Sequence, residues 1–113
     1  MALDIKFPFG LADSVALTAT GAQAVTIVDN MTIVDGVTVE ATGNRTLNLT
    51  IDASVKAGSM ISLKTKTNGT ETTVFGTGMT GVTLTGEAGK IFDFLFVYDG
   101  TSFRQVAAPI KVN

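Results

Sequence analysis

Apolar and polar residues alternate along most of the chain. The alternation is clearest over residues 14–19, 24–28, 46–51, 60–65 and 82–85, where apolar side chains are separated by single polar ones, most often Thr. Successive side chains of a β-strand point to opposite faces, so this period of two predicts strands with one buried and one exposed face. No segment of comparable length has the spacing of an amphipathic helix. The pattern therefore predicts an all-β protein.

Three dipeptides are strong turn signals, namely Asp35-Gly36, Asn68-Gly69 and Asp99-Gly100. Asp or Asn followed by Gly can adopt positive φ at both central positions, as a two-residue hairpin turn requires. The signals predict hairpins that join residues 31–34 to 37–40, 60–67 to 70–75 and 91–98 to 101–106. With the other glycines at strand ends, they predict one domain over residues 1–113, an antiparallel β-sandwich or jelly-roll-like barrel of about nine short strands.

Residues 91–98 differ from the other predicted strands because they are apolar on both faces. One face carries Phe92, Phe94, Phe96 and Tyr98, and the other carries Ile91, Leu95 and Val97 together with Asp93. Two interpretations follow: a central strand packed on both sides, or an aromatic face that contacts a second subunit. An isolated buried carboxylate is costly, so we expect Asp93 at a strand edge or an interface.

Residues 1–10 form a candidate extended N-terminal arm, with the apolar side chains Leu3, Ile5, Phe7 and Phe9. Pro8 disfavours regular pairing and holds the preceding residue extended, which suits a segment lying over a neighbouring subunit. An ordinary first strand is the alternative. The sequence begins without the pattern of a secretory signal and contains no run of about 18 apolar residues, so we expect a cytosolic product that does not span a membrane.

The composition restricts the chemistry that this chain can carry out. The 113 residues include no Cys, His or Trp. Thiolate nucleophiles, Ser-His-Asp triads and sites in which Cys or His binds a metal are therefore excluded. The acidic residues lie mostly in or beside turns without the spacing of a calcium-binding loop. We expect no enzymatic activity, no cofactor and no metal site.

Charge and hydrophobicity indicate which partners to expect. The formal net charge is −2 and the pI is about 4.8, so there is no electrostatic signal for binding nucleic acid. Hydrophobic residues make up 45% of the chain and charged residues only 16%. A surface with so little charge favours burial between subunits over a free monomer.

Two further patterns bear on ligands. Residues 76–81 match G-x-G-x-x-G, but the residues that follow continue a β pattern where a dinucleotide fingerprint needs a helix. We interpret them as a Gly-rich strand connection. Glycan sites usually stack exposed aromatic rings against sugars, and this chain offers only Tyr98, beside the Asp99-Gly100 turn, for that role.

Several short motifs recur from Thr46 onward. They are residues 47–52 (LNLTID), 55–58 (VKAG), 63–65 (LKT), 68–71 (NGTE), 74–78 (VFGTG), 85–90 (TGEAGK) and 96–103 (FVYDGTSF). In these motifs the chain resembles head-fibre, capsid-decoration and related virion β domains of tailed bacteriophages, and tail-fibre and baseplate domains share the pattern. The first 45 residues resemble them only in their Thr-rich β character.

The resemblance implies a non-enzymatic structural virion protein, a head fibre or cement protein that decorates or stabilises a phage capsid. Such proteins are made in the host cytoplasm, commonly form trimers and bind capsid proteins. The candidate oligomer or capsid contacts are Leu3, Ile5, Phe7, Phe9, Phe92, Phe94, Phe96 and Tyr98. The alternative is a carbohydrate- or receptor-binding β-sandwich module, such as a tail-fibre or adhesin tip.

Overall fold

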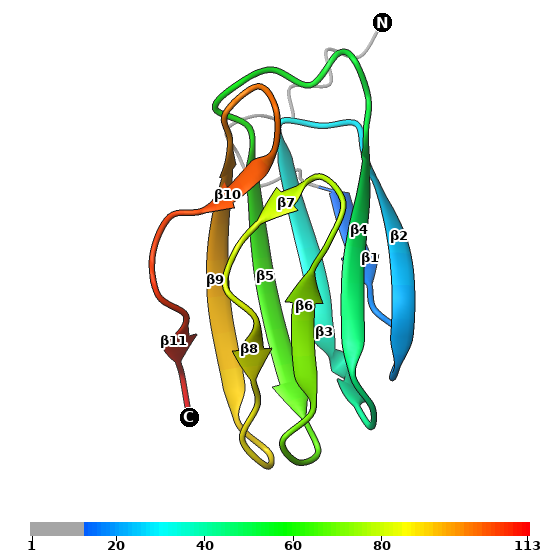
Figure 1. Ribbon diagram of the computed structural model, residues 1–113, viewed down its shortest axis with the longest axis vertical. Helices are drawn as coiled ribbons and strands as arrows, with labels where there is room; N and C mark the ends of the chain where they lie inside the picture. Colours follow the sequence, from blue (N-terminus) through cyan, green and yellow to red (C-terminus); the bar gives the residue numbers. More distant parts are fainter. Residues whose placement is uncertain (1–12) are drawn as a thin grey trace, which may run out of the picture.

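The computed structural model describes residues 13–113, which form eleven strands and no helix (Figure 1). The strands are β1 (Asp13–Ala16), β2 (Gly21–Ile27), β3 (Met31–Ala41), β4 (Arg45–Ile51), β5 (Met60–Thr67), β6 (Thr72–Phe75), β7 (Met79–Thr80), β8 (Leu84–Thr85), β9 (Ile91–Tyr98), β10 (Phe103–Gln105) and β11 (Ile110–Lys111). The prediction of an all-β protein is confirmed for this part of the chain.

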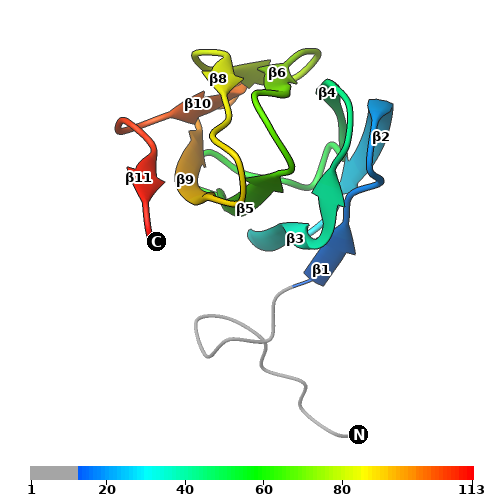
Figure 2. The same cartoon turned by 90° about the horizontal axis from the view of Figure 1, so that it is seen from below.

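The strands form two sheets that pack face to face. Sheet A has the order β1-β3-β5-β9-β10-β7, with β11 paired to β9, and sheet B has the order β2-β4-β6-β8. Figure 2 shows sheet A curling at its β10 end, where β10 pairs with β7. At the other end, β1 and β2 are the last described strands of their sheets.

The first six strands form a coil. β1, β3 and β5 run parallel to one another in sheet A, and β2, β4 and β6 run parallel to one another in sheet B. The chain crosses to the opposite sheet after each strand, so every turn of the coil adds one strand to each sheet (Figure 1). We call β1–β6 the coil.

The predicted antiparallel arrangement is wrong for the coil, because its consecutive strands face each other across the core and do not pair. Antiparallel pairing is found where β9 meets β5, β10 and β11, and where β6 meets β8. Neither a jelly-roll topology nor the smaller number of strands expected from the turn signals is confirmed.

The three turn signals have three different outcomes. Asp35-Gly36 lies inside β3, where Gly36 does not have a positive φ and the pairing with β5 shifts register before Ala41. Asn68-Gly69 connects β5 in sheet A to β6 in sheet B, so it forms no hairpin. Asp99-Gly100 does join an antiparallel pair, with Gly100 at φ +97°. Its connection spans residues 99–102, because Tyr98 pairs with Phe103, and is longer than the predicted two residues.

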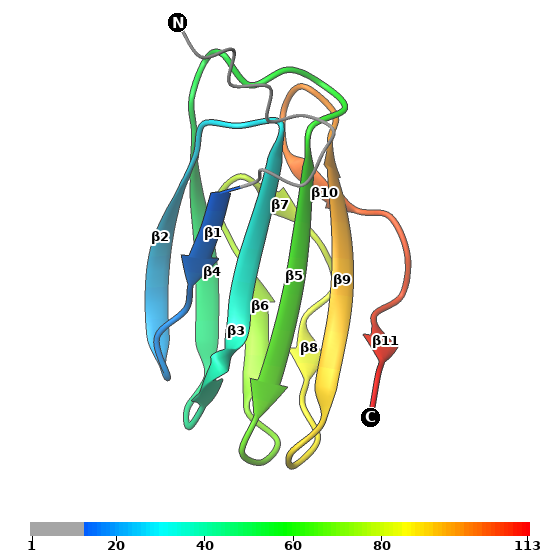
Figure 3. The same cartoon turned by 180° about the vertical axis from the view of Figure 1, so that it is seen from behind.

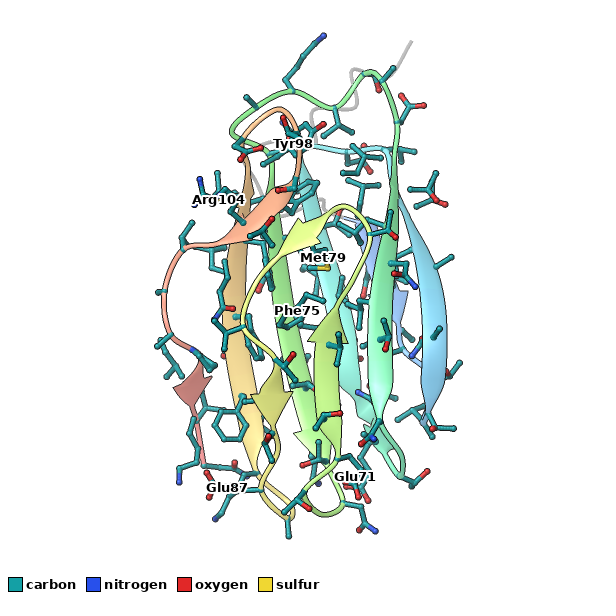
Figure 4. All side chains as sticks on the ribbon, in the orientation of Figure 1. Glu71, Phe75, Met79, Glu87, Tyr98 and Arg104 are labelled. Atoms are coloured by element: carbon teal, nitrogen blue, oxygen red, sulfur yellow. The ribbon has the colours of Figure 1, made fainter. Side chains whose placement is uncertain are left out.

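The core lies between the sheets and is built by the predicted alternation. Leu47 and Leu49 of β4 point inward, as do Phe94 and Phe96 of β9. Phe75 of β6 contacts both phenylalanines across the core, with ring centroids 5.3 Å from Phe94 and 4.9 Å from Phe96. Figure 4 shows Phe75 in the middle of the molecule. These edge-to-face contacts join the two sheets.

The Gly-rich segment 76–81 runs from the end of β6 through β7. A Cβ atom at Gly81 would lie 2.9 Å from a ring carbon of Phe75 and 3.2 Å from one of Phe96. Only glycine lets the backbone pass this close to the aromatic cluster. In this fold the segment is the strand connection that the β pattern after it predicted.

Candidate interaction surface

The predicted aromatic face lies in the core. Phe92, Phe94 and Phe96 are buried, so their rings are not on a surface that a second subunit can contact in this fold. Tyr98 is partly buried and stacks on Phe103 with ring centroids 4.9 Å apart. One face of the tyrosine ring is therefore already covered. The other candidate contacts, Leu3, Ile5, Phe7 and Phe9, lie outside the described residues.

The opposite face of β9 points away from the core, so the interpretation of a strand packed on both sides is wrong. Leu95 is 40% exposed, and the chain that pairs with β9 adds Val106 at 52%, Ile110 at 64% and Val112 at 50%. Together these side chains form a continuous apolar surface, which we call the outer patch. Its residues are Ile91, Leu95, Val97, Val106, Ile110 and Val112.

Strand pairing brings the outer patch together from two segments. The Val106 amide donates to the Leu95 carbonyl at 3.2 Å, and the Val112 amide donates to the Ile91 carbonyl at 3.0 Å. Opposite residues of an antiparallel pair share a face, so these side chains lie next to one another. Figure 3 looks onto this face of sheet A.

The patch continues across the neighbouring strands. Met60 of β5 is paired with Val97, and Ser62 of β5 lies between Leu95 and Ile33 of β3. Met60 and Ile33 are partly buried and point outward, in register with exposed positions of β9. The apolar surface therefore extends over the middle of sheet A.

Charged residues of both signs border the outer patch. Lys64 of β5 lies in register between Asp35 of β3 and Asp93 of β9. Asp93 is exposed, so its carboxylate reaches water without a burial cost. Arg104 is paired with Val97 on the same face, and its Nη1 lies 4.0 Å from Oδ2 of Asp99.

A groove opens beside the outer patch, with a volume of about 610 Å³. It is lined by residues 80–82 and 104–109, and Val106 belongs to both the groove and the patch. Gln105 holds the groove's two walls together. Its Oε1 accepts the Val82 amide at 2.9 Å, and its Nε2 donates to the Ala107 carbonyl at 2.9 Å. Val82, on the far wall, is 75% exposed.

A second cavity, of about 420 Å³, lies at one end of the molecule between residues 28–30 and 54–59. Its walls are held by local hydrogen bonds. Oδ2 of Asp52 accepts the amide of Ser54 at 3.0 Å, and the Ser59 hydroxyl donates to the Lys56 carbonyl at 2.7 Å. The Ser54 hydroxyl also donates to Asp52 and lowers the pKa of its carboxyl. These polar groups are satisfied by the turn itself.

Arg45 is a functional-looking residue that the sequence interpretation missed. It is fully buried between the sheets, where Nη1 donates to the Gly36 carbonyl at 3.0 Å and to the Thr65 hydroxyl at 3.3 Å. Nη2 donates to the Val39 carbonyl. Burial lowers the pKa of Arg45, and the charge of Asp35 opposes this effect.

The role of Arg45 is structural. β3 shifts register between Gly36 and Ala41, which frees backbone carbonyls from the ladder, and the guanidinium supplies donors to two of them. Buried carbonyls without donors are costly. The signal was present in the sequence, since Arg45 has the same parity as the inward-facing Leu47 and Leu49.

Asp35 and Asp99 stabilise the turns that follow them. Oδ1 of Asp35 accepts the Val37 amide at 2.8 Å, and its Oδ2 accepts the Thr38 hydroxyl at 2.6 Å. These hydrogen bonds, led by that of Thr38, lower the pKa of Asp35 from 3.8 to about 2. Oδ1 of Asp99 accepts the amides of Ser102 and Thr101, which lower the pKa of Asp99.

Two searches for other kinds of site gave no candidate. Within residues 13–113, no three acidic side chains gather in a way that could hold a metal ion. The same residues include no helix with the length and hydrophobicity needed to cross a bilayer.

Comparison with known proteins gives no match, whether with family models, with curated proteins or with solved structures. The interpretation of the surface therefore rests on the geometry of the chain itself.

Proposed function

We propose that this chain is a non-enzymatic structural protein of a virion, a head-fibre or cement protein that decorates or stabilises a phage capsid. It acts as a homo-oligomer, with a trimer favoured, and its partners are other copies of the chain and capsid proteins. The resemblance of residues 46–103 to such proteins supports the proposal. The observation that carries it is the outer patch.

The outer patch has the features of a protein–protein contact. Large exposed apolar patches on a folded domain mark interaction surfaces, because water around them is released when a partner covers them. Covering one exposed Val, Leu or Ile side chain contributes about 1.5–3 kcal/mol. Four side chains of the patch are at least 40% exposed, so a partner that covers them gains several such contributions.

The charges around the patch favour a second copy of the same chain as one partner. Lys64 and Arg104 provide positive charge, and Asp93 provides negative charge, on one face of sheet A. Two copies can therefore place opposite charges against each other while their apolar side chains pack. An oligomer that contacts several points of a repeating lattice binds more tightly than one subunit, because the later contacts form at high effective concentration.

The first test is the solution mass, measured by light scattering after size exclusion at two protein and two salt concentrations. We expect an oligomer, with a mass near three times 11.7 kDa, that persists on dilution. Leu95→Lys should shift the mass towards a monomer, because it places an ammonium group in the interface. Thr50→Lys is the matched control, since Thr50 is exposed on the outer face of sheet B and should leave the mass unchanged.

The two variants should have the same melting temperature when both are monomeric, which shows that Leu95→Lys acts on assembly and not on folding. An equal mass for both variants would remove the outer patch from the interface.

The second test is co-sedimentation with empty phage capsids that lack decoration proteins. We expect the oligomer to sediment with the capsids, and Leu95→Lys to sediment less than Thr50→Lys. A chain that is monomeric and stays in the supernatant contradicts the proposal. Binding on a glycan array in the same preparation would favour a receptor-binding module instead.

A further inference from the structure

Sheet B ends at β2 with an edge that no described strand covers (Figure 2). The Gly21 amide donates to the Asn44 carbonyl, and the Ile27 carbonyl accepts the Asp52 amide, both at 2.9 Å. These residues therefore point towards β4. Backbone direction alternates along a strand, so Ala22, Ala24 and Thr26 point their N–H and C=O groups to the open edge.

The open edge of β2 is well suited to pair with another strand. Its residues, GAQAVTI, include neither a charged side chain nor a proline, and these are the usual devices that keep an edge from pairing. Seven residues of backbone donors and acceptors are available there.

The coil predicts which segment belongs at this position. Within it, β2 leads into β3 through residues 28–30, so a strand of sheet B precedes a strand of sheet A by three residues. β1 begins at Asp13, three residues after Phe9. Residues 3–9 therefore hold the place in the sequence that a preceding strand of sheet B would hold, and the adjacent position in that sheet is the open edge of β2.

The side-chain pattern of residues 3–9 fits the same position. If Phe9 ends its strand as Ile27 ends β2, Phe7 lies beside Val25, which is buried. Lys6 then lies beside Ala24, which is exposed. Apolar residues of the segment thus share the inward face of sheet B, and its polar residues share the outward face.

Pro8 agrees with an edge position. In the coil, residues of sheet B with inward side chains point their backbone to the next strand, as the Leu47 carbonyl does when it accepts the Gly76 amide at 2.8 Å. Phe7 and Phe9 would point to β2 in the same way, and Pro8 would point away from it. The missing N–H of Pro8 then faces outward, where a proline is tolerated and prevents further pairing.

We propose that residues 3–9, which lie outside the described part of the chain, bind the open edge of β2 in their own chain as a parallel strand. The three-residue link to β1 makes the same chain the occupant, because the link matches the length by which the coil itself returns to sheet A. The proposal is independent of the outer patch, which lies on the other sheet.

Engineered cysteines test the register directly, because the chain has no Cys of its own. In the variant Lys6→Cys/Ala24→Cys the two positions lie on neighbouring strands about 4.8 Å apart, within the range of a disulfide. Mild oxidation should produce a cross-linked single chain on a non-reducing gel. The control is Lys6→Cys/Thr85→Cys, because Thr85 lies on β8 at the far edge of sheet B.

Hydrogen exchange of the full-length chain provides a second readout. Phe7→Asp should speed the exchange of the Ala24 and Thr26 amides by about tenfold or more, because local opening exposes them. The Leu49 amide, which donates to Thr77 inside sheet B, should keep its protection and shows that the fold is intact.

A single-chain cross-link specific to the Ala24 pair, together with the loss of protection at β2, is the expected result. Cross-linked dimers would overturn the proposal by showing that the segment binds a neighbouring copy. Equal cross-linking in the control, or no change in exchange at β2, would overturn it by showing that the segment does not occupy this edge.

Discussion

The coil and the antiparallel region around β9 are built from the same alternating pattern but present different surfaces. The outer face of sheet B in the coil carries small and polar side chains, such as Ala24, Thr26 and Thr50. The outer face of β9 carries Leu95 and Val97. The coil therefore supplies a regular framework with a wet surface, and the apolar surface that can meet a partner lies on the antiparallel region.

The two regions also use their turns differently. In the coil a turn carries the chain across the core to the other sheet, so each strand pairs with one that is two elements away in the sequence. Around β9, the Asp99-Gly100 turn returns the chain to the neighbouring position in the same sheet. The same kind of dipeptide thus serves two topologies, and the strands on either side decide which one forms.

The largest expected effect is at Phe94, in the antiparallel region. Phe94→Ala should lower the free energy of unfolding by about 3–5 kcal/mol, because it leaves a cavity next to Phe75 and removes the contact between the sheets. Leu95→Ala, the next residue on the same strand but on the outer face, is the control and should cost far less in a monomeric background. Urea denaturation measures both, and similar losses would contradict the inward placement of Phe94.

Arg45 provides the corresponding test inside the coil. Arg45→Ala should lower the free energy of unfolding by about 2–4 kcal/mol, because the carbonyls of Gly36 and Val39 lose their donors and a cavity remains. Arg104→Ala removes an exposed guanidinium and should change stability little. If the two alanine variants unfold at the same urea concentration, Arg45 does not hold the irregular part of β3.

The two Asp-Gly dipeptides separate steric from backbone effects. Gly36→Ala should cost about 1–3 kcal/mol, because its Cβ would lie 2.9 Å from the Lys64 carbonyl oxygen. Gly100→Ala should cost about 1 kcal/mol, because Gly100 has φ +97° in open space. Asn tolerates positive φ better than Ala, so asparagine should rescue position 100 and worsen position 36 in thermal melts. The same response at both positions would contradict this difference.

The smallest expected effect is in the pH dependence of stability. The pKa of Asp35 is lower in the folded chain, at about 2, than its ordinary value of 3.8. Its ionised form therefore stabilises the fold above the ordinary value, and this contribution is lost as the pH falls through about 2. Asp35→Asn should flatten the acid side of the stability curve, measured as urea midpoints. An unchanged slope would show that the Thr38 hydrogen bond does not persist in solution.

The sequence by itself determined the strands and most of the inward-facing residues, because the alternation of side chains is a local property of a strand. Leu47, Leu49, Phe94 and Phe96 point inward as their spacing predicts. The same rule also placed Arg45 inward, although its size and charge concealed the signal.

Only the tertiary structure decided how the strands pair. Parallel pairing in the coil joins residues that are far apart in the sequence, such as Val25 and Leu49, and no local pattern encodes that partner. It also decided which face of residues 91–98 is covered. Both faces are apolar, so only the presence of sheet B on one side puts the phenylalanines in the core and leaves Leu95 exposed.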